Sequence, residues 1–98
     1  MFDQLEIVED RYEQLNEMLS DPDVVNDSEK LRQYSKEQAD LQQTVDVYRQ
    51  YKQVKEDIEE IEAMLQETSD KDEIDILKED LNASKEQIPE LEDRLKFL

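Results

Sequence analysis

The stretch that decides the fold of this chain is its last 25 residues, IDILKEDLNASKEQIPELEDRLKFL, at positions 74–98. One set of positions recurs there at alternating steps of three and four residues: Ile74, Leu77, Leu81, Ser84, Ile88, Leu91, Leu95 and Leu98. Because an α-helix repeats every 3.6 residues, this spacing places all of these side chains on one face. All but Ser84 are apolar, so the stretch is expected to be an amphipathic helix that packs against another helix.

Pro89 is the one residue in this stretch that conflicts with a helix. Proline lacks a backbone N–H and clashes with the preceding turn, which costs ~3 kcal/mol in a helix interior. The apolar spacing nevertheless continues across Pro89 without a shift. We therefore predict a kinked helix rather than a broken one.

Two further helices are indicated upstream by the same spacing. The apolar positions of the first are Leu5, Val8, Tyr12, Leu15 and Leu19, and those of the second are Leu31, Tyr34, Leu41, Val45, Tyr48, Tyr51, Val54, Ile58, Ile61 and Leu65. In the second set, two steps of three follow each other between Tyr48 and Val54, which rotates the apolar stripe around the helix. The two halves of this long helix are therefore expected to face different partners.

Two polar stretches separate the helices. The first, at 20–27, contains Pro22 and several turn-forming Asp and Asn residues, and a capped turn is expected there. We expect Asn26, with Glu29 three residues later, to cap the second helix. In the second stretch, at 68–70, Ser69 is the expected cap of the third helix.

The expected fold is all-α, with three helices at about 2–19, 27–66 and 70–98 in a single domain that covers 1–98. Short connections make neighbouring helices antiparallel. The second and third helices should form a long, coiled-coil-like antiparallel hairpin. The shorter N-terminal helix should pack on the first half of the second.

Composition excludes several classes of function. The chain has 29 acidic and 12 basic residues, a formal charge of −17, and no Gly, His, Cys or Trp. Without Cys and His there is no Cys/His zinc site, no disulfide framework, and no thiol or imidazole catalysis. Without Gly there is no phosphate-cradling loop. The charge also argues against broad docking on nucleic acid or on an anionic membrane.

Neither export nor membrane insertion is indicated. No run approaches the ~18 apolar residues of a membrane span. The N-terminus is acidic from Asp3 onward and lacks the basic start and apolar stretch of a signal peptide. A cytoplasmic protein is expected.

Carboxylate side chains could in principle form an acid–base site or a calcium site. Paired carboxylates need burial to raise one pKa, and no acid lies on an apolar stripe, so a solvated face is the better interpretation. A calcium loop needs a ligand at position five and Gly at six, which Val25 and Asn26 do not provide. The remaining acids of that loop, Asp21, Asp23 and Asp27, fit a capped turn better.

Tyrosine side chains could in principle stack on nucleic-acid bases, and Ser or Thr hydroxyls could act as nucleophiles. Tyr12, Tyr34, Tyr48 and Tyr51 lie on helix stripes in acidic surroundings, which favours packing in the core or at its margin over base stacking. The Ser and Thr residues have no general base to activate them. The sequence therefore indicates no catalytic, cofactor-binding or metal-binding residues, and an interaction module remains.

Two stretches resemble a known family. They are EDRYEQLNEMLSDPDVVND at 9–27 and LRQYSKEQ at 31–38. They are similar to the N-terminal domain of the bacterial peptide chain release factor 1 family, the class I factors that read UAA and UAG. The resemblance covers essentially the whole chain. The sister family, which reads UGA and UAA, has a similar loop usually followed by Trp, and Val25 at that place favours the first type.

The resemblance implies a translation termination factor that directs hydrolysis of peptidyl-tRNA on the ribosome. The family's working motifs are a codon-reading Pro-x-Thr tripeptide and a Gly-Gly-Gln. This chain has no Gly, and neither Pro22 nor Pro89 is followed by Thr two residues on. No functional residue is therefore carried over. The chain is expected to be the non-enzymatic first domain of a longer factor.

The resemblance also implies partners. These are the stalk base of the large ribosomal subunit, the class II release factor GTPase and a glutamine methyltransferase that acts on the parent protein; DNA and membranes are not among them. The charge of −17 favours ribosomal protein over RNA as the contact of this domain. The alternative is a free-standing acidic coiled-coil interaction or scaffold protein, a dimer that buries the 74–98 stripe.

Overall fold

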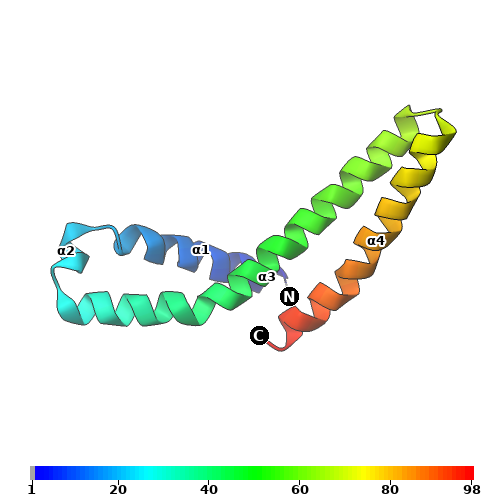
Figure 1. Ribbon diagram of the computed structural model, residues 1–98. Coiled ribbons are helices and arrows are strands. Elements are labelled where there is room, and N and C mark those ends of the chain that lie inside the picture. The colour runs from blue at the N-terminus through cyan, green and yellow to red at the C-terminus, as the bar shows by residue number, and fades with distance from the viewer. Residues whose placement is uncertain (1) are drawn as a thin grey trace. The chain divides into compact units, whose positions relative to one another are not determined.

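The computed structural model describes residues 2–98 and contains four α-helices (Figure 1). They are α1 (Phe2–Met18), α2 (Pro22–Val25), α3 (Ser28–Glu67) and α4 (Lys71–Lys96). No residue in this described range lies in a strand, which confirms the all-α class. The three predicted helices are present as α1, α3 and α4, and the stretch 20–27 adds a fourth, the one-turn helix α2, which was not predicted.

The short helix α2 forms because two residues at its start suit a helix N-terminus. Pro22 stands at the first helical position, where its missing N–H leaves no hydrogen bond unmade. The side chain of Asp21 accepts a hydrogen bond of 2.9 Å from the backbone N–H of Asp23. Val24 is buried and anchors the turn. Asp21 and Pro22, from which the sequence predicted a turn, therefore also begin a helix.

The N-cap of α3 is Asp27, so the prediction of Asn26 was wrong. Asp27 Oδ1 accepts hydrogen bonds from the backbone N–H groups of Glu29 and Lys30, at 3.1 and 3.2 Å. Asn26 instead ends α2, where its backbone N–H donates to the carbonyl of Pro22. Because α2 extends to Val25, α3 begins later than the capping-box spacing suggested.

The N-cap of α4 is Asp70, so the prediction of Ser69 was wrong as well. Asp70 Oδ1 accepts a hydrogen bond of 3.1 Å from the N–H of Asp72. The Asp70 N–H donates to Thr68 Oγ1 at 3.2 Å. The helices α3 and α4 are therefore both capped at the N-terminus by an aspartate. The negative charge of this carboxylate also interacts favourably with the positive end of the helix dipole.

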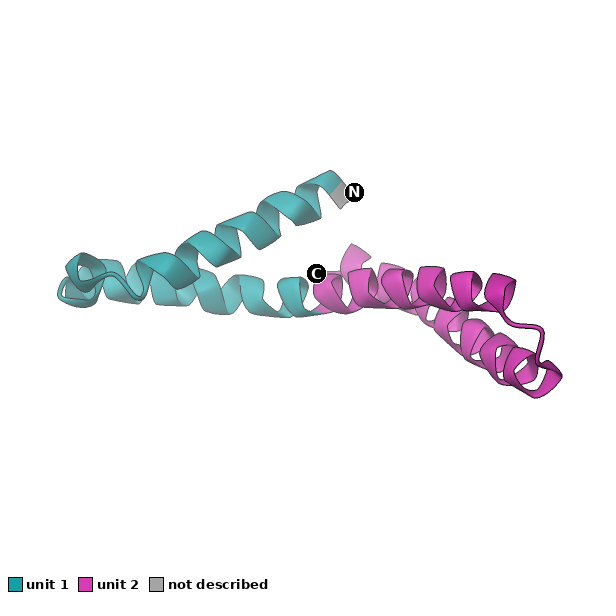
Figure 2. Cartoon of the chain, turned by 90° about the horizontal axis from the view of Figure 1, so that it is seen from above, with its two compact units in different colours: residues 1–46 teal, residues 47–98 magenta. Residues whose placement is uncertain are grey.

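The chain divides into two compact units, residues 1–46 and 47–98 (Figure 2). In unit 1, α1 lies antiparallel to the first part of α3, and α2 joins them (Figure 1). The buried side chains of this unit are Leu5, Leu15, Val24 and Val45, and Leu15 has no exposed surface. Unit 1 is thus a helical hairpin with few buried side chains.

Unit 2 is a second antiparallel hairpin, formed by the rest of α3 and by α4 (Figure 1). Its buried side chains are Val47, Tyr48, Tyr51, Val54, Leu77, Leu91 and Leu95. The three leucines belong to the 74–98 stripe, which therefore faces the inside of the hairpin. Pro89 lies within α4, and the helix continues to Lys96 without a break, as predicted. The kink at Pro89 stays a prediction.

The connections between the helices are built without left-handed backbone. No residue of the described range has a positive φ and no peptide bond there is cis. A chain without glycine is suited to such turns, because every residue keeps a conformation that a Cβ atom tolerates.

Candidate interaction surface

Acidic side chains are concentrated at the closed end of unit 2. Residues 56–75, which we call the acidic tip, comprise the last turns of α3, the connection 68–70 and the first turn of α4. They contain ten acidic side chains and one basic side chain, Lys71, so this fifth of the chain carries −9 of the total −17. All the acids are exposed except Asp57, which is half-buried. The tip is therefore a source of strong negative potential.

The acidic tip also exposes apolar surface. Met64 is 47% exposed and, with Glu67, Thr68 and Glu73, lines a shallow depression. Thr68 Oγ1 donates a hydrogen bond of 3.0 Å to Glu73 Oε2 across the connection. Just beyond the tip, Ile76 is 60% exposed. Exposed apolar side chains among carboxylates suit a protein partner that brings Lys or Arg together with apolar groups.

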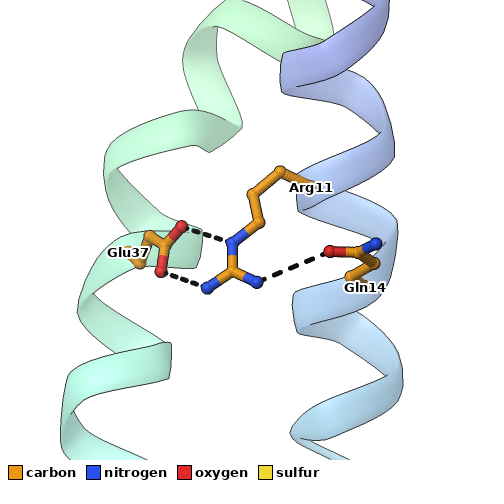
Figure 3. A network of polar contacts seen from close by, with 3 residues as sticks. All are labelled: Arg11, Gln14 and Glu37. Atoms are coloured by element: carbon orange, nitrogen blue, oxygen red, sulfur yellow. Dashed lines mark hydrogen bonds and ion pairs between the residues drawn. The ribbon is translucent and has the colours of Figure 1, made fainter.

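A polar network joins the two helices of unit 1 (Figure 3). Arg11 of α1 binds Glu37 of α3 through two hydrogen bonds, Nε to Oε2 at 2.6 Å and Nη2 to Oε1 at 2.8 Å. A longer contact of 3.5 Å joins Arg11 Nη1 to Gln14 Oε1. Such a fork between guanidinium and carboxylate fixes orientation as well as distance.

The same contact sets the charge state of Glu37. The hydrogen bond from Arg11 lowers the pKa of the Glu37 carboxyl below its ordinary value, and it raises the pKa of Arg11. A carboxyl that serves as a general acid near neutral pH needs a raised pKa. Glu37 has the opposite, so its chemistry is that of a structural ion pair.

A second polar contact lies beside the first. Gln38 Nε2 of α3 donates to Asn16 Oδ1 of α1, and both side chains are half-buried. Sequence reasoning missed this pair, although a signal was present. Gln38 stands four residues after Tyr34 and three before Leu41, which is an apolar position of the α3 stripe. Arg11 and Glu37 are 26 residues apart, and no local spacing reveals their contact.

Three of the four residues of the possible calcium loop are helix caps, and the fourth, Asp23, lies in the first turn of α2. Asp21 caps α2, Asn26 ends it and Asp27 caps α3. Within residues 2–98, no group of three or more acidic side chains is arranged to hold a metal ion.

The tyrosines lie in the core or at its margin, as the sequence indicated. Tyr48 and Tyr51 are each 5% exposed, while Tyr12 and Tyr34 are half-buried. Two lysines lie over the buried rings: Lys52 Nζ is 4.6 Å from the Tyr48 centroid, and Lys55 Nζ is 5.7 Å from that of Tyr51. These rings therefore offer little free face for stacking on a base.

None of the helices described between residues 2 and 98 combines the length and apolarity that crossing a membrane requires.

The fold and surface define a small acidic helical module, and comparison with known proteins gives its family. The PCRF domain model matches residues 8–98, so the chain belongs to the PCRF domain family. Over all 98 residues it is 72% identical to peptide chain release factor 1 of Staphylococcus carnosus, 71% to that of Staphylococcus haemolyticus and 68% to that of Staphylococcus aureus. The chain spans 27% of the length of these relatives. No solved structure matches it. The resemblance stated from residues 9–27 and 31–38 is confirmed.

Proposed function

We propose that this chain is the non-catalytic, ribosome-contacting first domain of a cytoplasmic translation termination factor that directs peptide release at UAA and UAG. The observation that carries the proposal is the 72% identity, over the whole chain, to a protein named peptide chain release factor 1. Val25, at the position where the sister family usually has Trp, supports the UAA and UAG assignment.

Catalysis and codon reading belong to other parts of such a factor. The chain contains no Gly, and hence no Gly-Gly-Gln, and no Pro-x-Thr tripeptide. Its role is therefore positional: it binds a feature of the ribosome and orients the domains that carry those motifs. The glutamine methyltransferase would act on the parent protein outside this chain, and the class II GTPase would act on the assembled complex.

The charge distribution supports a protein contact at the stalk base of the large subunit. Ribosomal RNA repels a surface with ten acids and one base, whereas a basic ribosomal protein attracts it. At physiological salt the screening length is about 8 Å, so the attraction acts over the last steps of approach. The acidic tip would then accelerate binding, and exposed Met64 would add apolar contact.

A segment swap tests the role of the domain. The corresponding segment of Staphylococcus carnosus release factor 1 is replaced by this chain, and peptide release is measured on ribosomes stalled at UAA, UAG and UGA. We expect release at UAA and UAG at the relative's own rate, and none from the 98-residue chain alone. A folded chimera that binds no ribosome, or release by the isolated chain, would contradict the proposal.

Charge reversal tests the contact surface. We expect Glu59→Lys/Glu60→Lys/Glu62→Lys, in the acidic tip, to slow association with ribosomes by about tenfold or more at low salt. The matched control is Glu17→Lys/Asp40→Lys/Asp46→Lys, which changes the same charge on exposed positions of unit 1 and should leave association nearly unchanged. Salt-dependent binding of the unmodified chain to naked ribosomal RNA would overturn the preference for protein.

The alternative, an acidic coiled-coil dimer, needs the 74–98 stripe free for a second chain. Leu77, Leu91 and Leu95 of that stripe are buried within unit 2 of a single chain, which counts against the dimer. Sedimentation equilibrium distinguishes the two: a monomer mass at all concentrations supports the proposal, and a dimer mass supports the alternative.

A further inference from the structure

The hydrophobic surfaces that join α1 to α3 do not by themselves select one alignment. The α1 positions Leu5, Val8, Tyr12, Leu15 and Leu19 recur at steps of three and four, as do the α3 positions Leu31, Tyr34, Gln38, Leu41 and Val45. Both sets therefore repeat every seven residues. A slide of α1 by seven residues, about 10 Å along α3, would bring similar apolar side chains together again.

The two polar contacts of this hairpin do not repeat. After a slide of seven residues, Asn16 would face Leu31 or Val45 in place of Gln38. The half-buried amides would then lose their hydrogen bond and lie against an apolar side chain, which is costly to the extent that the contact shields them from water. The native alignment is the one that satisfies both amides.

The ion pair between Arg11 and Glu37 also favours the native alignment over a shifted one. Seven residues before and after Glu37 stand Lys30 and Thr44. In a shifted alignment Arg11 would therefore meet a like charge or a neutral hydroxyl, and its two hydrogen bonds to a carboxylate would be lost.

We infer that the Asn16–Gln38 amide pair, supported by Arg11–Glu37, is a register lock: it selects one alignment of α1 on α3, and the amide pair itself contributes specificity rather than stability. A single polar pair in an otherwise apolar helix interface has this effect in coiled coils, where it fixes register at a cost in stability. Gln38 is the polar interruption of the α3 stripe, and Asn16 is its partner.

The test measures a distance between α1 and α3 in solution. Because the chain has no cysteine, Gln4→Cys and Arg32→Cys, both at exposed positions and well separated along the axis of the hairpin, can carry two spin labels in this 98-residue chain. Pulsed electron paramagnetic resonance then gives the distribution of label distances. The unmodified register should give a single distance.

The first variant removes the lock. Asn16→Leu/Gln38→Leu should give a second distance that differs by about 10 Å. This second population should grow in 1 M salt, which screens Arg11 from Glu37, while the melting temperature does not fall. The matched control, Gln33→Leu/Gln42→Leu, replaces two exposed amides of α3 and should keep the single distance. A single distance in the first variant at both salt concentrations would overturn the inference and assign the register to the connection through α2.

The second variant moves the lock without changing composition. The exchange Leu31→Gln/Gln38→Leu places the amide seven residues earlier in α3, at a position that is half-buried in the native protein. Asn16 should follow it, so the main label distance should shift by about 10 Å. If the native distance persists, the amide pair does not set the register, and the inference fails.

Discussion

The two hairpins of this chain hold their helices together by different means. In unit 1, an arginine–glutamate fork and an amide pair join α1 to α3 beside the buried Leu15 and Val45. In unit 2, Leu77, Leu91 and Leu95 of α4 are buried in an apolar interface, and the charge lies outside, at the acidic tip. Apolar burial therefore supplies most of the stability, whereas selective polar contacts supply uniqueness of arrangement.

The largest expected effects come from truncating one buried leucine in each unit. Leu15→Ala and Leu91→Ala should each reduce the free energy of unfolding by about 2–5 kcal/mol, since both leave a cavity where the side chain is 0% and 4% exposed. Urea unfolding followed by circular dichroism measures the loss.

Hydrogen exchange then shows whether the two units respond separately. Leu15→Ala should accelerate exchange mainly in α1, and Leu91→Ala mainly in α4. Ile7→Ala and Ile76→Ala are the controls: both side chains are more than half exposed, and each should change stability by less than about 0.5 kcal/mol. Equal acceleration in both helices by either leucine variant would contradict a separate response.

The two prolines should respond differently to replacement by alanine. Pro89→Ala should stabilise the chain by about 1–3 kcal/mol, because it restores a backbone hydrogen bond inside α4 and removes a clash with the preceding turn. Pro22→Ala should give no gain, since Pro22 begins α2, where proline is favoured. The urea midpoints of the two variants decide the matter. A loss of stability in Pro89→Ala would mean that tertiary contacts in unit 2 require the proline.

Removing the N-cap of α4 should have a smaller effect on stability, and this effect should distinguish Asp70 from its neighbour Ser69. Asp70→Ala should cost about 1 kcal/mol, because the N–H of Asp72 loses its acceptor. Ser69→Ala, one residue earlier, should be close to neutral. Thermal melts of the two variants provide the measurement, and an equal loss in both would show that Ser69 also takes part in the cap.

The smallest effect is the pH dependence of the ion pair in unit 1. Because the pKa of Glu37 is lower in the folded chain than its ordinary value of 4.5, the pair stabilises the fold above that value. This contribution is lost as the pH falls through the lowered pKa of the folded state. The stability difference between the unmodified chain and Glu37→Gln should therefore be present at pH 7 and shrink as the pH falls below 4.5. A difference that does not change with pH would contradict a role for the Glu37 charge.

Periodicity was enough to predict the three long helices, because the recurrence of apolar side chains is a local signal, and the short connections between them predicted their antiparallel order. The exact caps were missed for a physical reason: Asn26, Asp27, Ser69 and Asp70 all suit a cap, and only the three-dimensional path of the connections decides which one is used. The α2 helix was missed because Pro22 and Asp21 serve a turn and a helix start equally well.

The surface was predictable in part. The excess of acid was evident from composition, and its concentration in residues 56–75 can be counted directly in the sequence. The contact of Arg11 with Glu37 was not predictable, because it joins residues that only the fold brings together.

The all-negative φ angles of the described chain have a practical consequence. At each position the backbone already accepts a Cβ atom, so replacing a residue by alanine introduces no conformational strain. Apart from the two prolines, a complete alanine scan would therefore report on side-chain contacts and helix propensity, free of backbone strain.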